Sequence, residues 1–269
     1  MGPRNRFPTV VESVLSGSVK APAPWRRPAA IAVGVVGVAV YNWWLPVAVS
    51  RRLLTSPDEL FSDLEAAGRH DATLLQHLDL AAGLILLVAL LLRGPVSRAG
   101  GVGSAGAGVS GSGITRRSEW PWLIAFAVSG AVGGRFAYAC PEGLSASCRA
   151  AEWRLALPHH HYVHVVAGIV EFVTGTVAIY LAWQRTRAGR SAVTRAMRWT
   201  GRALVVSYPV LGFAYLTDRL GAFVEPVFFA CFSVVVAVEL LESDGRLPGP
   251  SVRIVPHARR VLQRVLHQA

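Results

Sequence analysis

The sequence contains few charged residues for its length. Only 16% of its 269 residues are Asp, Glu, Lys or Arg, whereas 52% are hydrophobic. A typical soluble domain carries about 25% charged residues, and disordered chains are poorer in apolar residues than this one. The mean hydropathy of +0.42 reflects the same imbalance. Both a soluble domain and a disordered chain are therefore excluded.

Cysteine, lysine and acidic residues are also scarce. Three cysteines are too few for a small domain held together by disulfides. Of the 27 basic residues 26 are arginine, and with 16 acidic residues the net charge is +11. Proteins that bind nucleic acids share such a balance, but they do not contain long uncharged apolar runs. No nucleic-acid partner is therefore expected.

The chain does contain six apolar runs, each close to the roughly 20 residues that cross the hydrocarbon layer of a membrane. They cover approximately residues 29–49, 72–92, 120–139, 160–183, 201–217 and 222–241. The runs are continuous, whereas the strands of a membrane barrel alternate between apolar and polar residues. The sequence predicts an all-α, polytopic integral membrane protein, with a six-helix bundle in residues 29–242.

The first run is predicted to be a retained helix. It follows a mostly polar N-terminal segment, residues 1–28, which is too long for the n-region of a typical signal peptide. The run ends in Tyr41, Trp43 and Trp44, and aromatic residues of this kind gather where a membrane helix meets water. We therefore expect these three side chains to form an interfacial belt.

The distribution of basic residues predicts the orientation. Cytoplasmic connections of membrane proteins are enriched in Arg and Lys. Most of the 27 basic residues fall in segments 1–28, 93–119, 184–200 and 242–269. The opposite side holds six, namely Arg51, Arg52, Arg69, Arg149, Arg154 and Arg219. We expect a protein of the cytoplasmic membrane with both termini in the cytoplasm.

Two cytoplasmic segments have distinctive compositions. Residues 94–118 form a Gly/Ser-rich linker that cannot bury a core. Its match to a dinucleotide-binding fingerprint at 101–106 lacks the flanking strand and helix that such a site requires, so no nucleotide binding is expected. Residues 243–269 form a basic tail that is amphipathic after Pro256. This tail is expected either to lie on anionic membrane lipids or to be a solubilising extension.

The cysteines provide an independent expectation. Cys140 and Cys148 flank a short loop that the orientation places outside the cell, where disulfides persist. A Cys140–Cys148 disulfide is therefore predicted, the alternative being two free thiols without a role. Cys231 lies within the sixth run and is expected to be a small buried apolar residue.

Polar residues inside the apolar runs gather toward the outer side of the membrane. An ionisable residue in hydrocarbon costs about 2.5–3.5 kcal/mol on insertion scales, so each one needs a reason. Asp79 lies in the second run, and Arg135 lies in the third. His160, His164 and Glu171 share one face of the fourth by their spacing. Further polar residues at the same level are Asp58, Glu59, Ser62, Asp63, Glu65, Asp218, Arg219 and Glu225.

Three accounts of this outer polar cluster are open. In a structural account, Arg135 pairs with Asp79 or Glu171 and fixes helix packing. In a ligand-binding account, the cluster receives a lipid headgroup or a small polar molecule, with Arg135 as the anion contact and Ser62 and Asp63 above it. In a catalytic account, His160 and His164 hold zinc at i, i+4 spacing, and the metal activates water.

In the catalytic account Asp79 or Glu171 is the third zinc ligand, and the substrate is a lipid amide or ester. Two further possibilities for the outer polar cluster are haem ligation and proton coupling through Glu171. No cofactor is expected, and zinc is the candidate in the catalytic account alone. Gly130 and Gly134 permit close helix approach, either within this chain or in a homo-oligomer.

Short motifs resemble known membrane families. Three segments resemble the bacterial family of domain of unknown function 998, namely the first run, Phe61-Ser62-Asp63-Leu64 and residues 79–83 (DLAAG). That resemblance implies a six-helix membrane fold and brings no established activity. The six-helix layout is similar to the Frag1/DRAM/Sfk1 group, whose roles concern membrane lipid organisation and trafficking.

The histidine pair is similar to that of the alkaline ceramidases and adiponectin-type receptors. Those proteins have seven helices and carry the pair on the last one, whereas His160 and His164 lie on the fourth of six runs. We therefore expect a non-catalytic role, namely binding of lipid or a small ligand or service as an accessory subunit. A zinc-dependent lipid hydrolase is the alternative.

Overall fold

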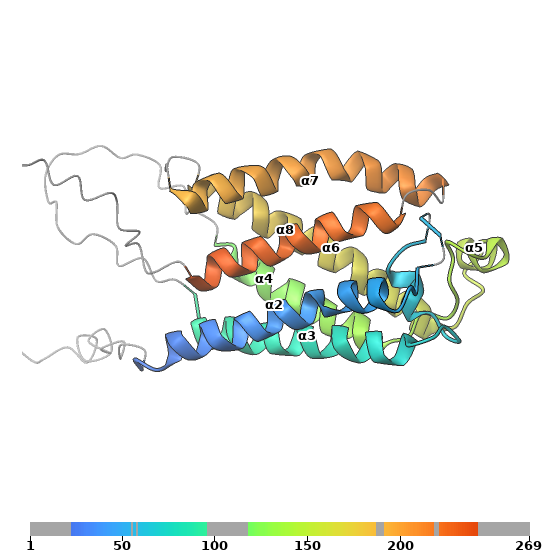
Figure 1. Ribbon diagram of the computed structural model, residues 1–269, viewed down its shortest axis with the longest axis horizontal. Helices are drawn as coiled ribbons and strands as arrows, with labels where there is room; N and C mark the ends of the chain where they lie inside the picture. Colours follow the sequence, from blue (N-terminus) through green and yellow to red (C-terminus); the bar gives the residue numbers. More distant parts are fainter. Residues whose placement is uncertain are drawn as a thin grey trace, which may run out of the picture.

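The computed structural model describes residues 23–54, 56–57, 59–95, 118–186, 191–217 and 221–241. Every regular element in these segments is a helix. Six long helices run along a common axis, and loops with a short helix cover one end of them (Figure 1). We call this the capped end; its cap consists of the described residues of 51–71 together with residues 136–158.

The long helices contact one another in a ring. They are α2 (Arg26–Ser50), α3 (Ala72–Arg93), α4 (Trp120–Arg135), α6 (His159–Thr186), α7 (Ala192–Thr217) and α8 (Gly221–Leu241). Each packs against the next in this order, and α8 packs back against α2. The cap adds the short helices η1 (Ser62–Glu65) and α5 (Ala146–Trp153), which the apolar runs do not predict.

Two helix boundaries differ from the predicted runs. Helix α4 ends at Arg135 rather than near residue 139, because Phe136 adopts an extended conformation with φ −110° and ψ 117°. Helix α7 begins at Ala192 rather than 201. Its first turns are amphipathic, with Met197 buried and Arg195 and Arg198 exposed, so a search for continuous apolar residues passes over them.

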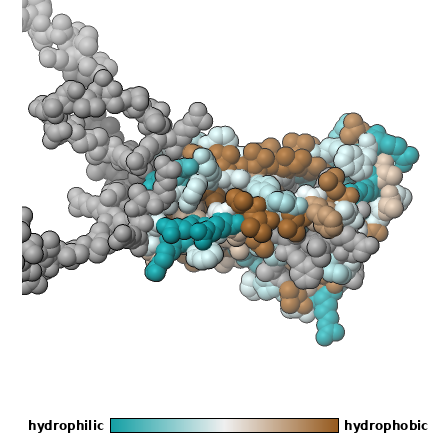
Figure 2. Space-filling view, turned by 90° about the horizontal axis from the view of Figure 1, so that it is seen from above, coloured by the Kyte–Doolittle hydropathy of each residue, from teal (hydrophilic) through white to brown (hydrophobic). Residues whose placement is uncertain are grey.

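The bundle has the surface of a membrane protein. Helices α2, α3 and α6 are long and apolar enough to cross a membrane. Large apolar side chains remain exposed along the bundle, among them Val36 (52%), Leu84 (49%) and Ile169 (59%). Figure 2 shows hydrophobic patches along the bundle. These faces have no protein partner among the described residues, and lipid chains provide the apolar environment that they require.

Aromatic side chains fill the centre of the ring. Phe126 and Phe228 each approach Phe232, with ring centroids 5.2 and 6.0 Å apart, and all three are fully buried. Tyr41 packs edge-on against Phe126 and is 5% exposed. The prediction that Tyr41 lies in an interfacial belt is therefore wrong. Helix α2 continues beyond Tyr41 to Ser50, so this side chain lies inside the bundle at the level of Glu171.

Glycines allow α3 and α4 to pack closely. A Cβ atom on Gly83 would overlap the backbone of Ala131, and one on Gly134 would overlap the backbone of Leu80. A Cβ on Gly130 would instead face α6, 3.5 Å from Glu171 Oε1. Of the two expected roles for Gly130 and Gly134, packing within the chain is the one that this geometry supports.

The cap is closed by the predicted disulfide. Cys140 and Cys148 are bonded, with their Cα atoms 6.1 Å apart. Cys231 is buried, as expected for a small apolar residue. The segment 1–22, most of the Gly/Ser-rich linker (96–117) and the amphipathic tail lie outside the described residues.

Candidate functional site

Acidic side chains from four elements meet inside the bundle near the capped end. They are Glu65 at the end of η1, Asp79 on α3, Glu171 on α6 and Glu225 on α8, and we call them the acidic cluster. Glu65 and Glu225 are 9% and 7% exposed, and the other two are partly buried. Glu65 hydrogen-bonds to Asp79, and the charges of Glu171 and Glu225 also act on Glu65.

Glu65 and Asp79 hydrogen-bond through their carboxyl groups. An ionised carboxylate only accepts hydrogen bonds, so this contact requires a proton on one of the two. Burial and the neighbouring charge of Asp79 raise the pKa of Glu65 well above its usual range. Glu65 Oε2 is buried and accepts no hydrogen bond from an N–H or O–H group of the described residues.

Asp79 and Glu171 border a small cavity. The Tyr41 hydroxyl donates a 3.1 Å hydrogen bond to Glu171 Oε1 at its edge. Gly83 and Gly130 contribute no side chain, which leaves room for about one water molecule. The complete lining is Tyr41, Asp79, Gly83, Leu86, Phe126, Ala127, Gly130 and Glu171.

Glu225 fixes η1 above this cavity. Its carboxylate accepts hydrogen bonds from the backbone N–H groups of Phe61 and Ser62, which begin the η1 turn. Gln76 Nε2 donates a 2.6 Å bond to the Glu65 carbonyl from α3. The turn that carries Glu65 is therefore held from both α8 and α3, which directs Glu65 toward Asp79.

Among the described residues, no arginine or lysine forms an ion pair with the acidic cluster. In the structural account Arg135 pairs with Asp79 or Glu171, and the described ion pairs contain no such pair. Arg135 is exposed at the end of α4, where its guanidinium lies 5.9 Å from the centroid of the Phe136 ring. Gly134 faces α3, and because successive residues are about 100° apart around a helix, Arg135 points away from α3.

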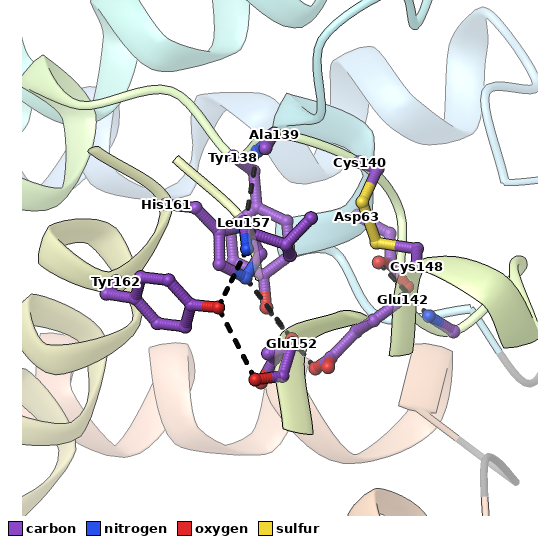
Figure 3. Close-up of polar contacts among 11 residues, drawn as sticks. Asp63, Tyr138, Ala139, Cys140, Glu142, Cys148, Glu152, Leu157, His161 and Tyr162 are labelled. Carbon is purple, nitrogen blue, oxygen red and sulfur yellow. Dashed lines mark hydrogen bonds and ion pairs between the residues drawn. A yellow bond between two sulfur atoms is a disulfide. The ribbon is translucent and has the colours of Figure 1, made fainter. Parts of the chain in front are cut away.

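A second polar network lies in the cap, beside the disulfide (Figure 3). The Ala139 N–H donates to His161 Nδ1 at 3.2 Å, so the proton of a neutral His161 is on Nε2. Nε2 lies 3.2 Å from Glu152 Oε2, to which it donates. His161 is fully buried and joins the start of α6 to α5.

Glu142 completes this cap network. It accepts a 3.2 Å bond from the Tyr138 hydroxyl and hydrogen-bonds to Glu152. As in the acidic cluster, two carboxyl groups in contact require a shared proton. Burial, followed by the contact with Glu152, raises the pKa of Glu142 to about 8.

Ser62 and Asp63, the residues predicted to lie above the cluster, are both on η1. Asp63 is fully buried and accepts hydrogen bonds from the N–H groups of Leu60 (3.2 Å) and Gly143 (3.4 Å). Burial raises its pKa to about 6, although these two bonds act in the opposite direction. Asp63 thus links η1 to the disulfide loop, and Ser62 is partly buried beside it.

The histidine pair predicted for zinc is divided between two environments. His160 is exposed, whereas His164 is buried and its Nδ1 donates to the carbonyls of Phe136 (2.9 Å) and Gly133 (3.1 Å). Across the described part of the chain, no group of three or more His, Cys, Asp or Glu side chains is arranged to hold a metal ion. The zinc hypothesis gains no support from this geometry.

Several site residues were missed in the sequence. Tyr41 was assigned to the interface, and the partnership of Glu142, Glu152 and His161 was not foreseen. A hydroxyl in the middle of an apolar run is a usable signal for Tyr41. The other three residues carry no comparable signal, because their meeting depends on the path of the loop 136–145 and on the placement of α5.

The opposite end of the bundle contains a separate ionic group. Arg185 lies 2.5 Å from Glu119 and 3.3 Å from Glu239, joining α6 to the start of α4 and to α8. The phenylalanines of the core lie between this group and the acidic cluster. The two polar regions are therefore separated by a layer of packed aromatic rings.

Comparison with known proteins gives no relative for this chain. No family model, no curated protein and no solved structure matches it. The resemblances drawn from short motifs stay predictions, and the chemistry of the site carries the functional argument.

Proposed function

We propose that the chain is a six-span protein of the cytoplasmic membrane, with the cap outside and both termini in the cytoplasm. The ring of helices supports this, since α4, α7 and α8 lie beside the three helices that are long enough to span. The disulfide in the cap supports an external location. Exposed arginines of α2 and α7 at the opposite end agree with a cytoplasmic side.

Within this frame, we propose that the protein is non-catalytic and binds protons reversibly at the acidic cluster. The observation that carries the proposal is that Asp79 and Glu171 line a water-sized cavity and that Glu65 hydrogen-bonds to Asp79. No basic residue of the described chain pairs with these three carboxyl groups. Adjacent carboxyl groups in a medium of low polarity do not all ionise. Uptake and release of protons is the chemistry that such a group performs.

The size and charge of the site argue against a larger ligand. A cavity with room for about one water does not admit a lipid headgroup. Arg135, the anion contact of the ligand-binding account, is exposed at the end of α4 and does not line the cavity. An acidic, water-sized site instead suits a proton and a water molecule that shuttles it.

The surroundings favour proton binding over conduction. On one side, the cap supplies the buried acidic groups of Asp63 and Glu142. On the other side, Phe126, Phe228 and Phe232 form an apolar layer. The buried hydroxyls beside it, those of Ser129 and Thr174, donate to carbonyls of their own helices. A proton that enters from the cap therefore reaches Glu171 and stops there.

Infrared difference spectroscopy of the protein in proteoliposomes tests the proposal. A step in pH should change the carboxylic C=O bands of the wild type, and D79N and E171Q should each remove part of that change. D71N is the matched control, because Asp71 lies in the cap beside Arg51 and outside the cluster. Identical difference spectra for D79N, E171Q and the wild type would refute proton binding at this site.

A flux measurement separates binding from transport. Proteoliposomes holding the wild type should show no proton flux above that of protein-free vesicles when a potential is applied. Flux that disappears in E171Q would replace the binding role with a transport role.

A further inference from the structure

Helix α7 presents an unusual stripe to the outside of the bundle, at the end opposite the cap. Arg195, Arg198, Trp199 and Arg202 are exposed, and their spacing of three, four and seven residues places them on one helix face. The guanidinium of Arg202 lies over the Trp199 ring, 5.1 Å from its centroid. Trp199 is 66% exposed. An exposed indole flanked by arginines is typical of a membrane–water boundary.

The same face continues as an apolar surface. Val206, Phe213 and Leu216 are 68%, 52% and 73% exposed and follow the arginines along the stripe. Arg195 and Arg202 are separated by about 10 Å along the helix axis, and Val206 and Leu216 by about 15 Å. The stripe therefore has a charged portion as deep as a headgroup layer and an apolar portion that acyl chains can cover.

The three α7 arginines differ from others at this end of the bundle. Arg26 and Arg27 donate to the carbonyls of Leu91 (3.2 Å) and Leu241 (3.5 Å), at the ends of α3 and α8. Arg185 is engaged by two glutamates.

By contrast, Arg195, Arg198 and Arg202 form no hydrogen bond or ion pair with any described side chain, apart from the contact of Arg202 with Trp199. The fold therefore leaves three guanidinium groups available on one face.

We propose that this α7 stripe is a binding site for an anionic phospholipid, whose phosphate contacts the three arginines and whose acyl chains cover the apolar portion. Guanidinium groups bind phosphate oxygens in paired hydrogen bonds, which suits them to this headgroup. The glutamates described at this end, Glu119 and Glu239, are buried beside Arg185 and do not oppose the negative charge. A zwitterionic headgroup carries its own cation and is a poorer match.

The test uses the full chain purified in a neutral detergent. Thermal unfolding is followed with phosphatidylglycerol, phosphatidylcholine or inorganic phosphate added, and bound lipid is counted by native mass spectrometry. The test variant is R195Q/R198Q/R202Q. Its matched control is R52Q/R135Q/R154Q, which removes the same charge from exposed positions at the capped end.

Phosphatidylglycerol should stabilise the wild type and the control variant, and phosphatidylcholine should not. The α7 variant should bind phosphatidylglycerol about a hundredfold more weakly at low salt, because three phosphate-facing charges are lost. The charge-conserving variant R195K/R198K/R202K should keep most of the binding and shows that the exchange of residues does not unfold α7.

Two outcomes would overturn the proposal. Equal lipid binding by the α7 variant and the control would mean that net charge, not this stripe, attracts the lipid. Protection by inorganic phosphate equal to that by the lipid would mean that the arginines hold a free anion.

Discussion

Replacing Glu142 with glutamine should remove a pH dependence from the stability of the cap. The pKa of Glu142 is raised from 4.5 to about 8 in the fold, so between these values the folded protein holds a proton that the unfolded chain releases. The contribution of this proton to the stability of the cap is therefore fully present below about pH 4.5 and is lost as the pH rises toward 8. In E142Q the amide donates permanently to Glu152, and the dependence on this proton disappears.

The size of the effect follows from the proton count. One proton held by the folded state corresponds to at most about 1.4 kcal/mol per pH unit, a tenfold change in the opening equilibrium. Water near the cap surface screens the interaction, so we expect about half of this free-energy change. It corresponds to about a threefold change in the opening equilibrium per pH unit. Asp63, with its pKa raised to about 6, adds a decrease of the same sign between about pH 4 and 6.

The rate at which a phosphine reductant opens the Cys140–Cys148 disulfide measures this local stability. The disulfide lies within the same cap, so it is reduced when the cap opens. The wild-type rate is divided by the rate at which the same reductant opens a small-molecule disulfide at the same pH. This ratio should rise about threefold per pH unit between about pH 6 and 8. E142Q should be nearly flat above pH 6. Parallel pH profiles for the two proteins would refute the assignment of the shared proton to Glu142.

Two further predictions concern packing and the disulfide. G134L should destabilise the protein by about 1–3 kcal/mol in thermal unfolding, because its side chain meets the α3 backbone. In G201A the new Cβ meets no atom within 4 Å, so an equal loss there would contradict the packing argument. C140S/C148S should lower stability by about 2–3 kcal/mol, chiefly through the cap. An unchanged proteolysis rate in residues 136–158 of that variant would show that the disulfide does not hold the loop.

The helices could be predicted from the sequence because they are long and apolar. Four of the six begin and end within three residues of the predicted runs. The beginning of α7 could not be found in this way, since its first turns alternate Arg195 and Arg198 with buried residues. Whether all six helices span a membrane stays a prediction, because length and composition single out three of them.

The acidic cluster was only half predictable. Asp79 and Glu171 are conspicuous as charges in apolar runs, and the structure brings them to one cavity. Arg135 was misplaced because its sequence position gives its depth and not its direction around α4. Glu65 could be recognised as a loop acid, but its contact with Asp79 depends on how Glu225 and Gln76 hold η1, a tertiary arrangement that periodicity does not encode.

Counting the protons bound by the purified protein tests most directly whether the acidic cluster is a proton site. An acid step from about pH 8 to 5, applied to the wild type and to D79N/E171Q, gives the number of protons taken up per chain. The double variant should take up at least one proton fewer. D71N should match the wild type, because the Arg51 hydrogen bond lowers the pKa of Asp71 and it stays ionised in this range. Equal uptake by D79N/E171Q and the wild type would contradict the proposed function.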